Sequence, residues 1–357
     1  MGLGAIVVVG AEQEIFSSAA PQSDLKALLT QPLACVEVLG RSVLESMIER
    51  FVRADVETIT VLVAAEHSCG VEPLRGAYEN VSVRTVDDVL SAVSDQLRDY
   101  SQRSIEHSFV VSANVYAETD LLDLFYFHRE ARQVATRGMD RDGTLDLWVV
   151  DCAQAHQSEL EGLLAQAEKI GATYFIRDYV NRLQHPQDLR RLVSDALSGR
   201  CAMRPCGREV RPGIWIDAGA EIDRGARIVA PAYVGRSSKI QEDTLITRFS
   251  SIEKDCYVDC GTVVEDSSIL ANTHVGIWLE VRHAVANGNR FLSLEHEVVL
   301  EISDPCVMRS NRPAQQETKN GLSWSRKARE PKIVADPNPK QSPAPEAWQL
   351  GADLIQG

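Results

Sequence analysis

The chain has 357 residues, of which 44% are hydrophobic and 25% are charged, and its formal net charge is −14. This length exceeds the size at which single hydrophobic cores usually stop growing, so we expect two folding units and a tail. The acidic charge disfavours non-specific binding to nucleic acid or to an anionic membrane, because both are polyanions. No stretch is apolar for long enough to span a membrane and no basic segment precedes the first apolar run, so we expect a cytoplasmic protein.

Residues 1–200 alternate short apolar runs with segments of helical periodicity, which is typical of an α/β domain with a mainly parallel sheet. The clearest helix is expected over residues 43–52, where a capping box precedes a single apolar stripe. Further helices are expected after Thr119 and over residues 186–197. We predict strands at residues 5–9, 58–63, 107–112, 145–150 and 173–176.

The periodicity changes after residue 210, where an aliphatic residue returns at every sixth position and a small residue follows four positions later. This pattern is typical of triangular coils of about 18 residues, in which the aliphatic side chain fills the axis and the small one fits a corner. We therefore predict a left-handed parallel β-helix over residues 210–310, with an irregular cap after a spacing slip that restarts the pattern at Val275 and Val281. The aliphatic series is Ile216, Ile222, Ile228, Val234, Ile240, Ile246, Ile252, Val258, Val264 and Leu270.

The chain loses its periodicity after the repeat, and the stretch PNPKQSPAPEAW is rich in Pro, Ser and Lys. Such a composition does not bury enough apolar surface to fold alone. We expect residues 313–357 to be a mostly disordered tail, with a short docking element at residues 348–355.

Three segments before the repeat resemble segments of the sugar-1-phosphate nucleotidyltransferases that carry a hexapeptide domain. Residues 32–44 (PLACVEVLGRSVL) are similar to that family's P-L-x-P-V-x-G-K-P-L segment, and residues 109–114 (FVVSAN) to its strand that delivers an aspartate. Residues 178–189 (DYVNRLQHPQDL) are similar to its G-Y-W-x-D-x-G-T-P-x-D-Y/L segment. The resemblance implies a three-layer nucleotidyltransferase-like domain over residues 1–200 and a role in nucleotide-sugar or polysaccharide metabolism.

The residues that would perform this family's chemistry depart from its pattern. In this family a sugar 1-phosphate attacks the α-phosphate of a nucleoside triphosphate and releases pyrophosphate, with the help of a glycine-rich loop, a lysine and two Mg²⁺-binding aspartates. Here the loop keeps only Gly10 before Ala11, and Gln31 replaces the lysine. Asn114 and Arg182 occupy the aspartate positions. Because Asn offers one neutral oxygen ligand and Arg none, we expect no metal site and no catalytic residues.

We interpret the chain as a catalytically impaired member of this family that acts as a binding, regulatory or assembly subunit; whether any catalysis remains is open at this point. Its expected ligand is a nucleotide sugar or a sugar phosphate, without a cofactor, since Mg²⁺ is expected only if the family reaction is retained. Its expected partners are further copies of the chain or an active paralogue. The candidate pocket residues are Gly10, Ala11, Gln31, Asn114, Asn181 and Arg182.

A second hypothesis is a hexapeptide-repeat acyltransferase whose active site lies on the β-helix. His274 occupies the only corner position of the repeat that is not small. Such enzymes use a histidine as general base between neighbouring coils, so His274 is the candidate base. The competing interpretation is that His274 is a capping residue at the irregular end of the repeat.

Two other groups of residues bear on binding. The eight cysteines lack the paired C-x-x-C spacing of zinc sites, and their spread does not indicate a disulfide framework. Four arginines form a basic cluster between the two domains. We expect this cluster either to bind a phosphate or an acidic surface, or to be an exposed linker. These arginines are Arg200, Arg204, Arg208 and Arg211.

Overall fold

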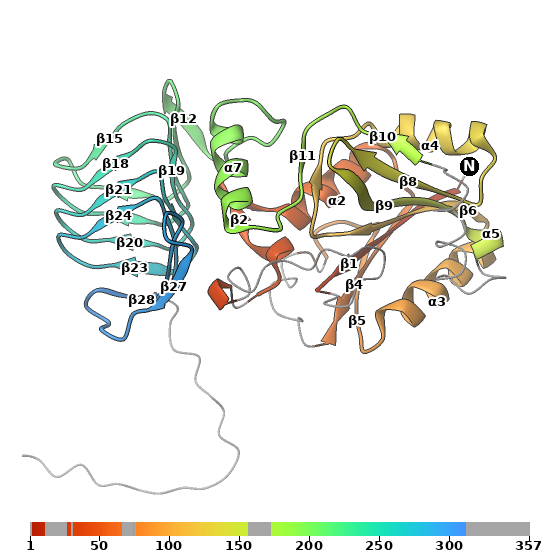
Figure 1. Ribbon diagram of the computed structural model, residues 1–357, viewed down its shortest axis with the longest axis horizontal. Helices are drawn as coiled ribbons and strands as arrows, with labels where there is room; N and C mark the ends of the chain where they lie inside the picture. The colour runs from red at the N-terminus through yellow and green to blue at the C-terminus, as the bar shows by residue number, and fades with distance from the viewer. Residues whose placement is uncertain are drawn as a thin grey trace, which may run out of the picture. The chain divides into compact units, whose positions relative to one another are not determined.

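A computed structural model of the chain describes residues 2–10, 27–29, 31–65, 74, 76–155 and 173–311. An α/β part precedes a coil of parallel strands (Figure 1), and both belong to one compact unit, Met1–Pro313. The protein is therefore a mixed α/β fold with several mainly parallel sheets and few helices. The expected tail, residues 313–357, lies outside the described residues. Among the helices that the structure describes, none has the length and apolar content needed to cross a membrane.

A seven-stranded sheet of order β10-β8-β9-β6-β1-β4-β5 forms the centre of the α/β part. Its neighbouring strands are parallel except at β9, which runs antiparallel to β6 and β8. The five predicted strands correspond to β1, β4, β6, β9 and β10. The prediction lacks β5 and β8, because neither carries a continuous apolar run. The strands span Gly2–Val9 (β1), Thr58–Ala64 (β4), Val81–Val86 (β5), Ile105–Ser112 (β6), Ala135–Asp140 (β8), Gly143–Asp151 (β9) and Thr173–Phe175 (β10).

Helices cover both faces of this sheet, which gives three layers. Ile48 of α2 and Leu124 of α4 belong to one hydrophobic cluster, whereas Leu97 of α3 belongs to another. Successive residues of a strand point to opposite faces, so Val7 of β1 joins the first cluster and Val8 the second. The helices span Leu33–Cys35 (η1), Val43–Arg53 (α2), Val89–Gln102 (α3), Leu121–Ala131 (α4), Cys152–Ala155 (α5) and Pro186–Leu197 (α7).

His128 of α4 is a buried titratable group in this part of the fold. Its Nδ1 lies 2.9 Å from Oγ1 of Thr136, and its ring is 5.3 Å from that of His107. Burial, with a smaller effect of His107, lowers the pKa of His128 to about 4. The imidazole is therefore neutral in the folded protein at neutral pH.

We expect this histidine to make the fold sensitive to acid. Between its ordinary pKa of 6.5 and its folded pKa of about 4, the unfolded chain binds one proton more than the folded chain, so stability falls as the pH falls. The full window is worth about 3 kcal/mol. Urea unfolding at pH 7 and pH 4 should show a smaller loss in His128→Asn than in the parent protein. Equal losses in the two proteins would contradict this assignment.

Residues 208–310 form a coil with three sheets, in which most strands pair in parallel with the strand three positions later in the chain. The first sheet contains β12 (Arg208–Arg211), β13 (Ile214–Ile216), β16 (Ala232–Val234), β19 (Ser250–Ile252), β22 (Ser268–Ile269), β25 (Ala284–Asn287), β26 (Arg290–Ser293) and β27 (Val298–Glu301). The second contains β14 (Glu221–Ile222), β17 (Lys239–Ile240), β20 (Tyr257–Val258), β23 (Thr273–Val275) and β28 (Met308–Ser310). The third contains β15 (Arg227–Ile228), β18 (Leu245–Thr247), β21 (Val263–Glu265) and β24 (Glu280–Arg282). The antiparallel strands β26, β27 and β28 end the coil, as expected for a cap.

The spacing slip of the repeat lies earlier than predicted. Ile252 pairs with Ile269, and Ile269 belongs to the axial cluster, so the axial residue after Val264 follows five positions later instead of six. Leu270, which the unbroken period predicts at the axis, instead belongs to the cluster that contains α7. The corner position after the slip is Thr273, whose Oγ1 accepts the N–H of Gly288 at 2.8 Å. The prediction failed because counting by six assumes coils of constant length.

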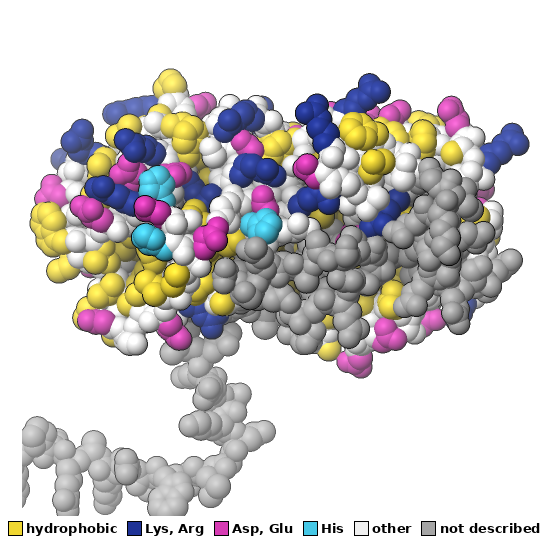
Figure 2. Space-filling model, in the orientation of Figure 1, with side chains coloured by type: hydrophobic (Ala, Val, Ile, Leu, Met, Phe, Trp, Pro, Cys, Tyr) yellow, Lys and Arg dark blue, Asp and Glu magenta, His cyan; other side chains and the backbone are white. Residues whose placement is uncertain are grey.

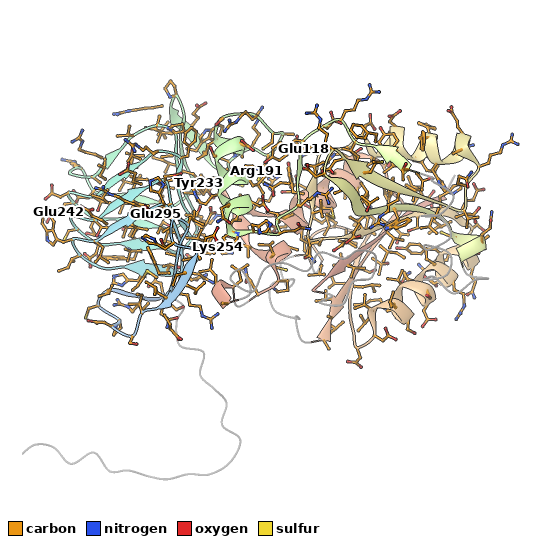
Figure 3. The ribbon with its side chains drawn as sticks, in the orientation of Figure 1. Glu118, Arg191, Tyr233, Glu242, Lys254 and Glu295 are labelled. Atoms are coloured by element: carbon orange, nitrogen blue, oxygen red, sulfur yellow. The ribbon has the colours of Figure 1, made fainter. Side chains whose placement is uncertain are left out.

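The outward face of the first coil sheet packs against the α/β part. Tyr233 and Leu270 share a hydrophobic cluster with Leu192 of α7 and Val38 of β2 (Glu37–Val38). Tyr233 and Lys254 lie on the side of the coil that faces α7 and β2, whereas Glu242 lies on the far side (Figure 3). The two parts therefore share a hydrophobic core.

Candidate functional site

The ends of β1 and β6 bring two of the candidate pocket residues to one edge of the sheet. Val8 pairs with Ser112, and the N–H of Ala113 donates to the carbonyl of Val8 at 2.9 Å. Gly10 and Asn114 each follow these strand ends by one or two residues, and Gly10 adopts a positive φ of 77° that favours glycine. Ala11 lies outside the described residues.

The side chain of Gln31 forms its hydrogen bond within its own segment of the chain. Its Nε2 donates to the carbonyl of Cys35 in η1 at 3.0 Å. The side-chain amide thus caps a short turn, and the structure gives it no contact with the other candidate residues that it describes.

A two-stranded ribbon places the remaining candidate residues beside Asn114. β7 (Tyr116–Ala117) pairs antiparallel with β11 (Val180–Asn181), with Tyr116 opposite Asn181. The Asn181 side chain is buried, donates to the carbonyl of Asp188 at 2.8 Å and accepts the N–H of Leu183 at 3.0 Å. Asn181 therefore holds the entry to α7.

The guanidinium group of Arg182 is engaged by the turn between β8 and β9. It forms an ion pair with Asp140 and donates to the carbonyls of Thr144 at 3.0 Å and Gly143 at 2.9 Å. Its charge is matched by Asp140, and three of its donor directions end on the protein. The hypothesis that Arg182 replaces the metal as a phosphate ligand therefore requires that it first leave these partners.

His274 does not lie at a corner of the coil. After the slip it pairs laterally with Tyr257, with the two rings 5.1 Å apart, and β28 covers it on the other side. Only 5% of the residue is exposed, its Nε2 lies 3.7 Å from Asp259, and burial lowers its pKa. A general base must reach a substrate, so this geometry favours the capping interpretation over the acyltransferase.

A cavity of about 630 Å³ lies between α2, the segment that joins β7 to α4, and the linker after α7. This volume is in the range of small-molecule sites. Arg41 and Arg53 both pair with Glu49, at 2.6 Å and 3.1 Å, so one carboxylate faces two guanidinium groups. Arg204 is exposed and forms no ion pair with a residue that the structure describes. The arginines that line the cavity are Arg41, Arg50, Arg53, Arg200 and Arg204.

Carboxylates line the same cavity. Oε1 of Glu118 (Figure 3) accepts the hydroxyl of Tyr116 at 2.7 Å and the N–H of Ala202 at 2.5 Å, which ties the linker to β7. Asp120 uses Oδ1 to cap α4 through the N–H groups of Leu122 and Asp123. Asp178 is exposed at the cavity. The cavity thus combines cationic groups with free carboxylate oxygens.

Sequence reasoning identified only part of this cavity. It singled out Arg200 and Arg204 as part of a basic cluster, but Arg208 and Arg211 of that cluster lie in β12 of the coil. Arg50 and Arg53 belong to α2 and look like ordinary solvated residues, because their meeting with the linker depends on the tertiary fold. None of the six candidate pocket residues lines the cavity, although Tyr116 belongs to the ribbon that carries Asn181.

No protein-family model matches the sequence, and no curated protein is significantly similar to it. Among the residues that the structure describes, no group of three or more His, Cys, Asp or Glu side chains is placed to hold a metal ion.

Proposed function

We propose that this protein binds a nucleotide sugar or a sugar phosphate but does not catalyse nucleotidyl transfer, as a degenerate member of the sugar-1-phosphate nucleotidyltransferase family. In this proposal the α/β part is nucleotidyltransferase-like, and the coil has the left hand that the hexapeptide pattern predicts. The protein then acts as a binding, regulatory or assembly subunit in nucleotide-sugar or polysaccharide metabolism.

The observation that carries the proposal is the chemistry of the cavity beside the ribbon. Guanidinium groups bind phosphate through charge-assisted hydrogen bonds, and carboxylate oxygens accept hydrogen bonds from hydroxyl groups. A phosphorylated sugar offers both partners. Arg53 and Arg204 come from different walls of the cavity, so a phosphate between them receives donors from two sides.

The proposed loss of transfer chemistry is supported by what fills the positions of the family's metal ligands. Asn114 offers one neutral oxygen, and Arg182 brings a cation that is already paired with Asp140. Mg²⁺ needs anionic oxygen ligands, which neither residue supplies. Without the ion, the developing charge on a transferred phosphate lacks its main stabilisation.

Calorimetric titration with glucose 1-phosphate, UDP-glucose and ADP-glucose tests the binding. We expect saturable binding of at least one ligand and a loss of tenfold or more in affinity for Arg53→Ala combined with Arg204→Ala, since each contact to a charged group is worth roughly 1.5 to 3 kcal/mol. Arg98→Ala on α3, whose exposed arginine also forms an ion pair, is the matched control and should bind like the parent protein.

Two results would contradict the proposal. Binding that is unchanged in the double variant would place the ligand outside the cavity. Formation of a nucleotide sugar from glucose 1-phosphate, a nucleoside triphosphate and Mg²⁺ would show that the transfer chemistry is retained.

A further inference from the structure

Three carboxylates of the cavity lie together. Glu118 and Asp120 come from the segment that joins β7 to α4, and Asp178 comes from the segment before β11. The N–H of Glu118 donates to the carbonyl of Tyr179 at 2.8 Å, which brings Asp178 beside Glu118. Glu118 lies between α7 and the seven-stranded sheet in the view of Figure 3, where acidic and basic side chains lie next to each other on the surface (Figure 2). We call Glu118, Asp120 and Asp178 the acidic wall.

Tyr174 shows that two of these carboxylates act on one place. Its hydroxyl donates to Asp123 at 2.5 Å. Burial and this hydrogen bond, with smaller effects of Asp120 and Asp178, raise the pKa of Tyr174 to about 12. Asp120 and Asp178 are distant in the sequence, but the fold places both of them close enough to Tyr174 to oppose its ionisation.

The acidic wall has oxygen atoms that the protein does not use. Asp178 forms no hydrogen bond or ion pair through its side chain with a residue that the structure describes. Asp120 caps α4 through Oδ1 only, and Glu118 accepts hydrogen bonds through Oε1 only. One carboxylate and two further oxygens are therefore available to a ligand.

Two cationic groups adjoin the acidic wall. The guanidinium group of Arg50 donates to the carbonyls of Ala117 and Thr119, and it offsets one of the three negative charges. Arg177 precedes Asp178 but does not line the cavity. The acidic wall therefore keeps an excess of negative charge, which a cationic group of a ligand can neutralise.

A buried hydroxyl group lies within the acidic wall. Thr119 lines the cavity between Glu118 and Asp120, and it is only 4% exposed. Its Oγ1 has no hydrogen-bond partner among the residues that the structure describes. Buried polar side-chain atoms are nearly always hydrogen-bonded in native proteins, so this hydroxyl points to a partner that the ligand supplies.

We infer that the ligand of this cavity is an amino sugar phosphate, whose ammonium group binds to the acidic wall while its phosphate binds to Arg53 and Arg204. This inference rests on the proposed function and names the class of sugar. An ammonium group has three N–H donors and no acceptor, which matches the oxygens of Asp120, Asp178 and Thr119. A metal ion matches this wall less well, because no three His, Cys, Asp or Glu side chains in the described part of the chain are placed to hold one.

Calorimetric titration with glucosamine 1-phosphate, glucose 1-phosphate and N-acetylglucosamine 1-phosphate tests this inference. We expect the parent protein to bind glucosamine 1-phosphate at least tenfold more tightly than the other two, because neither a hydroxyl nor an acetylated amine carries the positive charge. Asp120→Asn combined with Asp178→Asn should abolish this preference and leave the affinity for glucose 1-phosphate within about threefold. Asparagine caps a helix as well as aspartate does, so the double variant keeps the start of α4.

Glu130→Gln is the matched control, because Glu130 is an exposed carboxylate of α4 that does not line the cavity. It should bind all three ligands like the parent protein, and circular dichroism melting should verify that each variant folds. A preference for glucosamine 1-phosphate that is absent in the parent protein, or that survives in the double variant, would overturn the inference. If none of the three sugar phosphates binds, the inference fails, whereas the proposed function fails only if UDP-glucose and ADP-glucose also do not bind.

Discussion

Replacement of Glu253 by alanine should lower the free energy of unfolding by about 2 to 5 kcal/mol, because the carboxyl group of this buried residue joins the coil to the α/β part. Its oxygens accept the N–H groups of Leu39 at 3.0 Å and Gly40 at 2.9 Å, in the turn between β2 and β3 (Arg41–Ser42). The variant leaves the buried N–H of Leu39 and the partly buried N–H of Gly40 without this acceptor. Urea unfolding at pH 7 measures the loss.

The matched control for this substitution is Glu242→Ala on the far side of the coil. Glu242 is exposed and has no hydrogen bond or ion pair through its side chain to a described residue, so its removal should change stability by less than about 0.5 kcal/mol. If both variants unfold at the same urea concentration, the turn is not held by Glu253.

The ionisation of Glu253 adds a pH dependence to this contact. Burial, opposed by the two backbone N–H groups and reinforced by Glu37, raises the pKa of Glu253 to about 8. Between pH 4.5 and about 8 the folded protein therefore binds more protons than the unfolded chain, and stability falls as the pH rises. Comparison at pH 6.5 and pH 9 avoids the window of His128. Glu253→Gln should lose this part of the slope, and an unchanged slope would refute the assignment.

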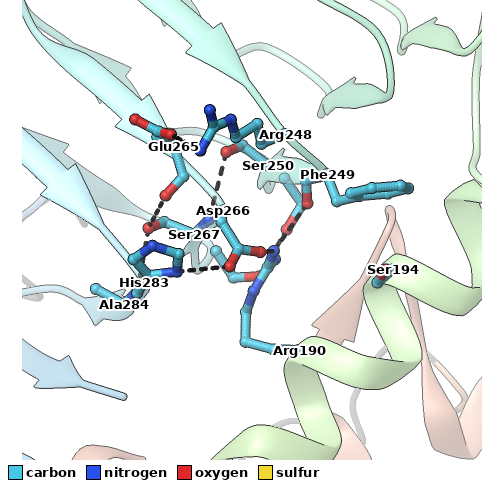
Figure 4. Close-up of polar contacts among 12 residues, drawn as sticks. Arg190, Ser194, Arg248, Phe249, Ser250, Glu265, Asp266, Ser267, His283 and Ala284 are labelled. Carbon is cyan, nitrogen blue, oxygen red and sulfur yellow. Dashed lines mark hydrogen bonds and ion pairs between the residues drawn. The ribbon is translucent and has the colours of Figure 1, made fainter. Parts of the chain in front are cut away.

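Replacement of Arg190 by methionine should cost about 1 to 3 kcal/mol, because it removes the donor that the buried guanidinium group offers to the carbonyl of Phe249 and to the hydroxyl of Ser268. Arg190 extends from α7 and donates to Ser268 at 2.7 Å, to the carbonyl of Phe249 at 3.0 Å and to Asp266 at 2.9 Å (Figure 4). The carboxylate of Asp266 is 40% exposed and also lies 2.7 Å from Nδ1 of His283, so it keeps water and this ring as partners when Arg190 is removed. Urea unfolding again provides the measurement.

The neighbouring Arg191 provides a matched control on the same helix. Its side chain is 54% exposed and pairs only at 3.7 Å with Asp188, so Arg191→Met should unfold within about 0.5 kcal/mol of the parent protein. Equal effects of the two substitutions would mean that the cost arises from helix α7 itself and not from its contact with the coil.

Much of the fold follows from local patterns in the sequence. The capping box of Ser42 and Glu45 is present at the start of α2, since both of its hydrogen bonds form within four residues. Eight of the ten aliphatic residues belong to the axial cluster of the coil or pack against it, and Ile216 pairs in register with Val234 of that cluster, because the period repeats a local geometry. The tenth, Leu270, and the corner assigned to His274 were wrong, because one shortened corner shifts every later residue by one position.

The candidate site was less accessible to sequence reasoning, because its contacts join distant segments. Arg182 has the side chain of a phosphate ligand, but its partner Asp140 lies 42 residues earlier in the chain. The cavity likewise depends on how α2 meets the linker that contains Arg204. The residue types show which side chains could bind a ligand, whereas the tertiary fold determines which of them already have hydrogen-bond or ion-pair partners within the protein.

The shortened corner after Val264 has a further consequence for how the two parts recognise each other. If every turn of the coil presented the same side chains, the α/β part would pack equally well against the coil when shifted by one turn along its axis. Here the residues that follow the axial position on successive rungs are Gly235, Glu253, Leu270 and Asn287. These four side chains differ from one turn of the coil to the next, so the α/β part packs against the coil in one register only.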